Sequence, residues 1–175
     1  AKIEDLISYR LKNEKLVKLK KTDKIVIKDK KYQIKIFENQ LDGSEHFALI
    51  KGKISPSKNT RVRVISSNLV ESYLLGKRLP NSFNNTLDYF KDYNNCILVF
   101  IRDSNLKSVS STLRDFKSDK KNKIGNDRLI RNYGIGAQII KALRVKNMIL
   151  VTRSPKKVIG LEGFGIKITK QEIIK

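Results

Sequence analysis

The sequence predicts an α/β domain, in the α+β sense, with a mixed sheet flanked by helices. Apolar runs such as CILVFIRD (96–103) are apolar on both faces, as in the centre of a covered sheet. They alternate along the chain with amphipathic stretches of helical periodicity. At 175 residues the chain is long enough for one domain with a sizeable core and too short for two comfortable ones. We therefore expect one domain preceded by a short leading segment.

The first elements in chain order are a helix and two strands. Residues 1–19 carry aliphatic side chains at roughly helical spacing, at Ile3, Leu6, Ile7, Leu11 and Leu16. Residues 21–39 alternate apolar with polar side chains, which predicts a half-buried strand whose apolar side is formed by Tyr32, Ile34 and Ile36. The stretch 41–52 contains an Asp-Gly turn signal followed by a second strand. We expect these two strands to pair as a hairpin or as near neighbours.

The middle of the chain predicts a third strand and two short helices. After a loop at 55–60, RVRVIS (61–66) has strand character. Residues 69–76 and 85–93 read as short helices on either side of a loop at 77–84. The covered strand 96–103 follows them.

The last third predicts a helix and the last core strand. The polar stretch 104–127 indicates a partial helix that ends in a basic loop. Residues 131–145 form an amphipathic helix whose inward side chains are Ile135, Ile139, Ile140 and Leu143. NMILVT (147–152) then predicts the last core strand.

Positive charge dominates the composition. The chain has 38 Lys and Arg against 17 Asp and Glu, a formal net charge of +21. Basic side chains placed on phosphates release counterions, so this charge raises a nucleic-acid hypothesis. However, the lysines are spread along the whole chain, aromatic residues do not interleave with them, and no zinc finger or helix-turn-helix pattern is found. We expect non-specific attraction to polyanions and no specific nucleic-acid partner, and we keep a basic nucleic-acid-binding module as an alternative.

The sequence argues against a membrane protein, a secreted protein and a metal site built from cysteines. No apolar run approaches the roughly 20 residues that span a bilayer, and the first residues show no signal-peptide pattern, so we expect a cytoplasmic protein without a membrane partner. Cys96 is the single cysteine and lies in an apolar strand, which predicts a core residue, because a tetrahedral zinc site needs several ligands. His46 is the single histidine, and we expect a structural hydrogen-bonding role for it.

A candidate phosphate site follows the last predicted strand. The run VTRSPKK (151–157) places polar groups just past the carboxyl end of a strand, where open α/β sheets collect ligands. Thr152 offers a hydroxyl and Lys157 a charge to a phosphate. The alternative is a solvated basic turn in which Ser154 and Pro155 begin a helix. The glycines of NYGIGAQ and GLEGFG do not complete a dinucleotide fingerprint.

The order of several blocks resembles the GTP cyclohydrolase II family. These blocks are DGSEHFALIKG, RVRVIS and RNYGIGAQIIKALRVKNMILVTRSPKKVIGLEGFGIKI, and the resemblance covers about residues 32–168, with 104–130 poorly matched. It implies that family's fold and a homodimer. The opening IEDLISYRLKNE resembles the joint of bifunctional riboflavin-pathway proteins, in which a 3,4-dihydroxy-2-butanone 4-phosphate synthase domain comes first. We therefore expect residues 1–24 to be a linker or helix from the end of such a domain, and 25–175 to be the cyclohydrolase-like domain.

The resemblance also implies that the family's catalytic zinc has no ligands here. The family binds zinc through three cysteines spaced C-x10-C-x-C, and these positions fall on Asn68, Leu79 and Asn81. None is a thiolate, so we expect no metal in this domain and no water activated by one. By the same resemblance, magnesium belongs to the preceding synthase domain.

Other catalytic elements of the family are incomplete. The family's EGRGIG element falls on residues 104–109, where its acid and its arginine are both missing. The acid of the Asp-x-Arg-x-Tyr motif falls on Leu129, while Arg131 and Tyr133 remain, so Arg131 is a relic of the catalytic set. A catalytic tyrosine has no clear match, with Phe116 the nearest aromatic residue.

Four positions keep the residue types that the family uses on the nucleotide and its phosphates: Arg63, Ser66, Thr152 and Lys157. Such contacts need only fixed donors and charge. The resemblance therefore implies a catalytically degenerate GTP cyclohydrolase II-like domain that acts as a scaffold, dimerisation or nucleotide-sensing module. The preceding domain would convert ribulose 5-phosphate to dihydroxybutanone phosphate and formate. The alternative enzyme is an active GTP cyclohydrolase II with an unusual metal site.

Overall fold

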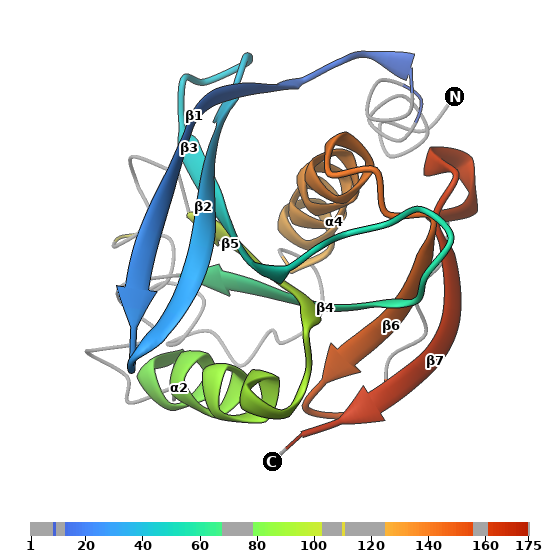
Figure 1. Ribbon diagram of the computed structural model, residues 1–175. Coiled ribbons are helices and arrows are strands. Elements are labelled where there is room, and N and C mark those ends of the chain that lie inside the picture. Colours follow the sequence, from blue (N-terminus) through green and yellow to red (C-terminus); the bar gives the residue numbers. More distant parts are fainter. Residues whose placement is uncertain are drawn as a thin grey trace.

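A single mixed sheet of seven strands lies between two helices, α2 and α4, in the computed structural model (Figure 1). The structure describes residues 9, 13–67, 79–102, 110, 125–155 and 161–174, with the side chains of 79–80 and 125–133 left out. The strands are β1 (Val17–Ile27), β2 (Lys30–Asn39), β3 (Glu45–Gly52), β4 (Thr60–Ser67), β5 (Asn95–Arg102), β6 (Asn147–Thr152) and β7 (Lys167–Ile173). The helical elements are α2 (Leu79–Tyr89), η2 (Phe90–Asp92), α4 (Gly125–Ala142) and η3 (Leu161–Phe164).

The strand order confirms the predicted fold class. The order across the sheet is β1-β2-β3-β5-β4-β6-β7. The β1–β2, β2–β3 and β3–β5 pairs are antiparallel, whereas β5–β4, β4–β6 and β6–β7 are parallel. The predicted pairing of residues 21–39 with 41–52 is present as the β2–β3 hairpin. The carboxyl ends of β4 and β6 therefore open on the same edge of the sheet.

The beginning of the chain differs from the prediction. Residues 21–39 are not one strand, because Lys28 and Asp29 adopt positive φ angles of 49° and 59° and turn the chain between β1 and β2. Two successive positive φ angles are typical of a tight hairpin turn with the twist of its strands. The predicted helix over 1–19 also extends too far, since β1 begins at Val17. The predicted domain boundary at 24/25 falls inside β1.

The segment predicted as a loop at 77–84 is helical from Leu79 onward. Pro80 stands at the start of α2, where its missing N–H costs nothing and its fixed φ suits the helix. The Thr86 hydroxyl donates to the carbonyl of Ser82 at 2.7 Å inside the helix. The predicted helix at 69–76 and most of the predicted polar segment at 104–127 lie outside the described residues.

The end of the chain adds a strand. NMILVT forms the buried strand β6, as predicted, and a further strand that the sequence analysis did not predict, β7, pairs in parallel with it after the short η3 turn. Its burial pattern is mostly exposed, so its sequence lacks the apolar run that identifies a core strand. β7 is nevertheless the element that brings Glu172 to the sheet.

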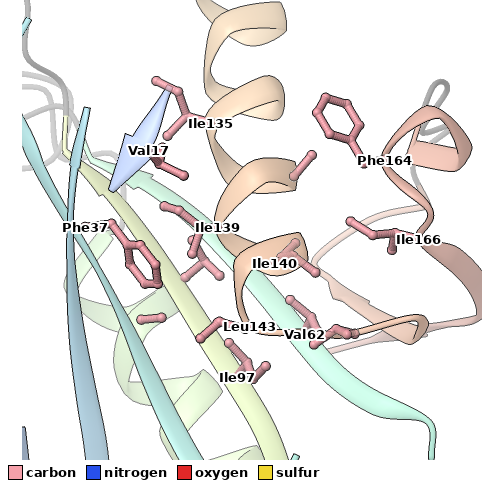
Figure 2. Close-up of a cluster of buried hydrophobic side chains, with 14 of the residues drawn as sticks. Val17, Phe37, Val62, Ile97, Ile135, Ile139, Ile140, Leu143, Phe164 and Ile166 are labelled. Atoms are coloured by element: carbon pink, nitrogen blue, oxygen red, sulfur yellow. The ribbon is translucent and has the colours of Figure 1, made fainter. Parts of the chain in front are cut away.

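Helix α4 covers one face of the sheet, hereafter the α4 face (Figure 2). It begins earlier than the predicted 131–145 and ends at Ala142. The four side chains predicted to point inward are all buried, although Leu143 lies one residue past the end of the helix, which confirms that pattern. They pack with aliphatic side chains of the strands and with Phe37 and Phe164. A Cβ atom at Gly136 would lie 3.3 Å from Ile101 Cδ1, so the glycine lets helix and sheet approach closely.

Helix α2 covers the other face, hereafter the α2 face. The buried side chains of this face include Tyr32, Leu49, Ile65, Leu87, Phe90, Cys96 and Leu98. The burial of Cys96 confirms its prediction as a core residue. No helix in the described part of the chain is long and apolar enough to cross a membrane.

Candidate functional site

Strand alternation separates the predicted phosphate-binding residues onto two faces of the sheet. On β4, Val62 packs into the core of the α4 face, whereas Arg63 bonds to Ser82 of helix α2. On β6, Leu150 belongs to the α4-face core and Val151 to the α2-face core. Successive side chains of a strand point to opposite faces. Thr152 therefore lies on the α4 face, and Arg63 lies on the α2 face.

Thr152 is a buried hydroxyl at the carboxyl end of β6. The residue is 3% exposed, and its Oγ1 has no hydrogen-bond partner among the described residues. The β4–β6 pairing ends at Val62 and Leu150, two residues before Thr152. Burying a hydroxyl without a hydrogen bond costs free energy, and a bound ligand that accepts its proton would offset that cost.

Arg63 is a buried guanidinium that is held only by neutral groups in the described structure. It is 8% exposed, its Nη1 donates to the Val151 carbonyl at 3.0 Å, and its Nη2 donates to Ser82 Oγ at 3.2 Å. Its Nε is enclosed and has no partner. Burial lowers the pKa of Arg63, and the charge of nearby Arg153 lowers it further. Two hydrogen bonds therefore fix the position of the Arg63 guanidinium, and no described carboxylate neutralises its charge.

The other predicted site residues occupy more exposed or undescribed places. Ser66 is exposed near the end of β4, opposite Ile101 of β5. Lys157 lies outside the described residues. Arg131 belongs to the first half of α4, where side chains are not described. The binding roles of all these residues stay predictions.

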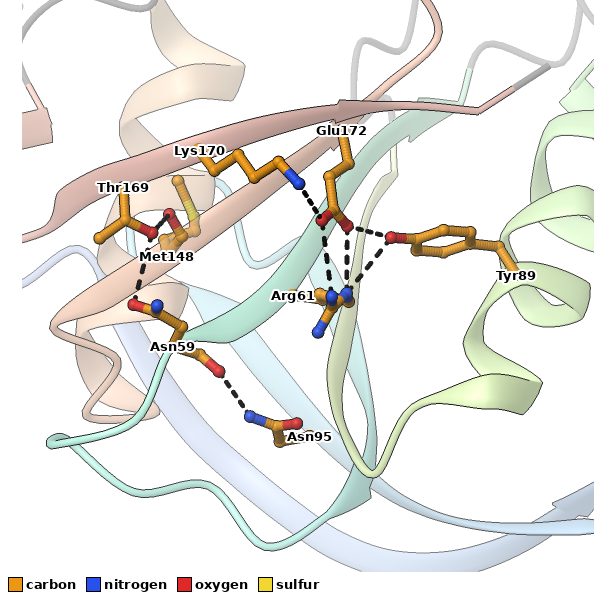
Figure 3. Close-up of polar contacts among 8 residues, drawn as sticks. All are labelled: Asn59, Arg61, Tyr89, Asn95, Met148, Thr169, Lys170 and Glu172. Atoms are coloured by element: carbon orange, nitrogen blue, oxygen red, sulfur yellow. Dashed lines mark hydrogen bonds and ion pairs between the residues drawn. The ribbon is translucent and has the colours of Figure 1, made fainter.

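A polar cluster on the α2 face joins β4, α2 and β7 (Figure 3). Arg61 Nε lies 3.1 Å from Glu172 Oε2 and 3.2 Å from the Tyr89 hydroxyl. Tyr89 donates a short hydrogen bond to Glu172, and Lys170 Nζ lies 3.1 Å from Glu172 Oε1. The Arg61 guanidinium also stacks 3.6 Å above the centre of the Tyr93 ring. Glu172 thus fixes the C-terminal end of α2 against the last strand.

The electrostatics of this cluster favour the ion pair. Burial raises the pKa of Glu172, but hydrogen bonds from Tyr89 and Lys170 and the charge of Arg61 outweigh it, so the pKa of that carboxyl is lowered. Burial and the hydrogen bond to Glu172 raise the pKa of the Tyr89 hydroxyl. Glu172 therefore stays ionised and Tyr89 stays protonated at neutral pH. The sequence carries no sign of this cluster, because Lys170 and Glu172 belong to β7, which is mostly exposed and has no apolar run to mark it as a strand.

Cys96 and His46, the two soft metal donors of the sequence, are far apart. Cys96 pairs with Lys51, and Phe47 pairs with Phe100, so His46 is level with Ile101, five residues from Cys96. At about 3.4 Å per residue, that separation is about 17 Å. The two side chains also lie on opposite faces by alternation. Burial raises the pKa of the Cys96 thiol to about 11, which keeps it protonated.

His46 has the predicted structural role. Its Nδ1 accepts a hydrogen bond from the Arg102 backbone N–H at 3.2 Å, and its Nε2 lies 3.3 Å from Ser44 Oγ. The Ser44 hydroxyl donates to Asp42 Oδ1 at 2.6 Å. In this arrangement the neutral ring donates its Nε2–H to Ser44, so it cannot accept the Ser44 proton. The group is therefore not a nucleophile with its base.

The sequence has no thiolate at the three positions that correspond to the family's zinc-binding cysteines, of which Asn68 lies outside the described residues. The family positions for the three cysteines carry two amides and a leucine, and Asn81 lies exposed on α2. Within the described ranges, no group of three His, Cys, Asp or Glu side chains is placed to hold a metal ion. Amide and aliphatic side chains do not replace the thiolates of a zinc site.

Several known proteins are similar to this chain in sequence. The family model described as GTP cyclohydrolase II matches residues 19–172. A protein of Oryza sativa subsp. japonica named as a probable monofunctional riboflavin biosynthesis protein RIBA 3, chloroplastic, is 31% identical over 95% of this chain and 33% of its own length. The riboflavin biosynthesis protein RibBA of Aquifex aeolicus is 28% identical over 99% of this chain and 46% of its own length. The chain thus spans less than half the length of these relatives.

A solved structure shares the fold. It is RibBX, described as a two-domain 3,4-dihydroxy-2-butanone 4-phosphate synthase from A. baumannii. The TM-score is 0.63 with 24% sequence identity, and the match covers 98% of this chain and 44% of that one.

Proposed function

Because the chain belongs to the GTP cyclohydrolase II family, we propose that it is a non-catalytic member that keeps a binding site for the phosphates of a nucleotide. We call this site, at Thr152, the phosphate grip. It is a GTP cyclohydrolase II-like domain of riboflavin biosynthesis, as its relatives indicate. Within a longer protein, it would follow a 3,4-dihydroxy-2-butanone 4-phosphate synthase domain and act as its nucleotide-sensing module. We place that protein in the cytoplasm.

Donor chemistry supports the loss of catalysis. One cysteine and one histidine cannot supply three soft ligands, and the structure separates the two residues by the length of five strand positions. The Cys96 thiol is buried and stays protonated, whereas zinc takes the thiolate. The word "monofunctional" in the name of the Oryza sativa relative and the two-domain synthase description of RibBX are compatible with a domain that has no cyclohydrolase activity of its own.

The buried Thr152 hydroxyl is the observation that carries the phosphate grip. It lies at the carboxyl end of β6, the end of parallel strands at which open α/β sheets bind ligands, and it has no hydrogen-bond partner in the part of the chain that the structure describes. A phosphate oxygen is an acceptor for such a hydroxyl, and the positive charge of the VTRSPKK run adds attraction. Arg63 and Ser66 stay candidates for the same nucleotide through the family resemblance.

Calorimetric titration with GTP at near-physiological salt tests the grip. We expect saturable binding to the wild-type chain and a loss of about tenfold or more in affinity in Thr152→Val, because a hydrogen bond to a charged group is removed. Thr60→Val is the matched control, since Thr60 is also buried with an unpartnered hydroxyl but lies at the start of β4. Equal affinity in the Thr152 and Thr60 variants would refute the assignment.

The titration also separates the other roles. Absence of GTP binding by the wild-type chain would leave a scaffold or dimerisation role, for which sedimentation analysis of the chain measures the predicted homodimer. ATP and inorganic phosphate in the same titration show whether the base or the phosphates are recognised.

A further inference from the structure

A group of positive charges lies at the amino ends of the parallel strands. β5, β4, β6 and β7 are parallel neighbours that begin at one edge of the sheet, opposite to the edge at which Thr152 ends β6. We call the edge where they begin the amino edge. Six exposed cations lie along it or beside it, on the β3–β4 loop, at and after the end of α4, and at the start of β7: Lys53, Lys58, Lys141, Arg144, Lys146 and Lys167.

Hydrogen bonds hold the segments of the amino edge together. Asn147 Nδ2 donates to the Pro56 carbonyl of the β3–β4 loop at 3.4 Å, and the Lys167 N–H donates to the Lys146 carbonyl at 2.8 Å. Figure 1 shows this loop running past the starts of β6 and β7. The fold therefore gathers cations from distant parts of the sequence on one edge.

None of these six cations forms an ion pair with a carboxylate of the described residues. The lysines that do form ion pairs lie elsewhere, for example Lys20 with Glu38 of β2. The loop 53–59 and the segment 141–147 contain no acidic residue. Clustered charges of one sign create a positive potential, which attracts a polyanion to this edge.

The backbone at Arg144 gives a second observation. The Arg144 N–H donates to the Lys141 carbonyl at 2.9 Å, and the Val145 N–H donates to the Ile140 carbonyl at 3.3 Å. These bonds form the Schellman motif that ends α4, and Arg144 takes its left-handed position with a φ of 61°. Glycine is the usual residue there, because a side chain is strained at positive φ. The chain instead carries a long, exposed cation at this position.

We propose that the amino edge binds the phosphate backbone of a nucleic-acid duplex without reading its sequence. Neighbouring strands are about 5 Å apart, so cations at the starts of β4, β6 and β7 form a row and not a pocket. A row of cations fits successive phosphates, and a duplex carries one negative charge per about 1.7 Å of its axis. The loop 53–59 and the segment 141–147 have no aromatic side chain on which an unpaired base could stack, which favours a duplex over a single strand.

This surface is separate from the phosphate grip. Thr152 lies at the carboxyl end of β6, whereas Lys146 immediately precedes the amino end of the same strand. The proposal gives a location to the non-specific attraction to polyanions that the composition predicts. It does not depend on whether the chain binds GTP.

Fluorescence anisotropy with a labelled DNA duplex of about 20 base pairs tests the binding. We expect saturable binding at about 0.1 M salt, with equal affinity for duplexes of different sequence. The logarithm of the association constant should fall linearly with the logarithm of the salt concentration, with a slope of about −3 to −5, because several phosphates release counterions. Absence of binding at this salt concentration would overturn the proposal.

Two variants of equal net charge test the location. Lys146→Gln with Lys167→Gln removes two cations of the amino edge, and Lys30→Gln with Lys31→Gln removes two exposed cations beside the β1–β2 turn. The first variant should bind the duplex about tenfold or more weakly, with the salt slope reduced by about 2. The second should lose about twofold or less. Equal losses would show that overall charge alone attracts the duplex, which contradicts the assignment to this edge.

Arg144→Gly separates binding from folding. Glycine adopts a positive φ without strain, so this variant should be about as stable as wild type in chemical denaturation. We expect it to bind the duplex about three- to fivefold more weakly, because one phosphate contact is lost. Unchanged affinity would refute the assignment of Arg144 to this surface.

Competition experiments test other occupants. Unlabelled duplex should displace the labelled duplex at a lower concentration of charge than poly-glutamate does. Equal displacement by poly-glutamate would indicate a docking surface for acidic proteins, and tighter binding of a single strand of the same length would contradict the preference for a duplex. Lys146→Gln with Lys167→Gln should keep the GTP affinity of the wild-type chain, so failure of this surface and failure of the phosphate grip are distinguishable.

Discussion

The two faces of the sheet are stabilised in different ways. The α4 face is closed by apolar packing, with Ile139 fully buried among strand residues and the aromatic rings of Phe37 and Phe164 nearby. The α2 face has an apolar core too, but at β4 and β7 it buries charged groups: Arg61 is paired with Glu172, whereas Arg63 has no carboxylate partner among the residues that the structure describes. Apolar packing therefore accounts for the stability of the α4 face. The α2 face also buries arginine side chains, whose burial costs free energy that apolar packing does not recover. This difference can be measured by substitution.

The largest effect is expected on the α4 face. Ile139→Ala should lower the free energy of unfolding by about 3–4 kcal/mol, because it removes a fully buried side chain and leaves a cavity beneath α4. Chemical denaturation followed by circular dichroism measures it. Lys141→Ala, exposed on the same helix, is the control and should change the value by less than about 0.5 kcal/mol. A loss below about 1 kcal/mol in Ile139→Ala would show that α4 does not pack as described.

The paired arginine of the α2 face should give an intermediate effect. Glu172→Gln leaves Arg61 largely buried without its counter-charge, so we expect a loss of about 2 kcal/mol in the free energy of unfolding. Denaturation at neutral pH measures it. Asp88→Asn removes a carboxylate with two exposed lysine partners and should leave the stability nearly unchanged. Equal losses in the two variants would contradict the distinction between buried and exposed pairs.

The unpaired arginine should give a smaller effect. Arg63→Met removes a buried charge that has no described counter-charge, which stabilises the fold. It also removes two hydrogen bonds, which destabilises it, so the free energy of unfolding should stay within about 1 kcal/mol of wild type. The same denaturation experiment measures it, now without phosphate in the buffer. A loss as large as that in Glu172→Gln would mean that Arg63 has a counter-charge. It would contradict the difference that we infer between Arg61 and Arg63.

The smallest effect concerns pH and His46. Burial lowers the pKa of His46 from the ordinary value of 6.5, the charge of Arg102 lowers it further, and Asp42 opposes the shift. The unfolded chain therefore binds a proton at a higher pH than the folded chain, and stability falls as pH drops below 6.5 toward the lowered value. Unfolding free energies at several pH values, with His46→Gln as reference, measure this contribution. A wild-type curve parallel to that of the variant would refute it.

Much of the fold could be predicted from local patterns. The apolar runs identified β5 and β6, and the helical spacing of Ile135, Ile139, Ile140 and Leu143 identified the buried side of α4. β1 and β7 were not predicted as separate strands, because both are mostly exposed edge strands whose place depends on their neighbours. The turn at Lys28 and Asp29 lacks the Gly or Asn that normally marks it.

The candidate site shows a different limit. Arg63 and Ser66 are three positions apart on one strand, and this odd separation places them on opposite faces of the sheet. The sequence alone therefore indicated that the two side chains do not line one site. Ser82 and Glu172 could not be found in that way. Each lies far along the chain from β4, and only the packing of α2 and the addition of β7 bring them to it.

The central claim is that this member of the family has no cyclohydrolase activity, and a combined assay of zinc content and GTP turnover tests it. The chain is purified with zinc supplied, its bound zinc is measured by mass spectrometry, and GTP consumption is followed over hours. We predict zinc well below one ion per chain and no GTP consumption above a protein-free blank. One zinc ion per chain together with catalytic GTP turnover would contradict the account.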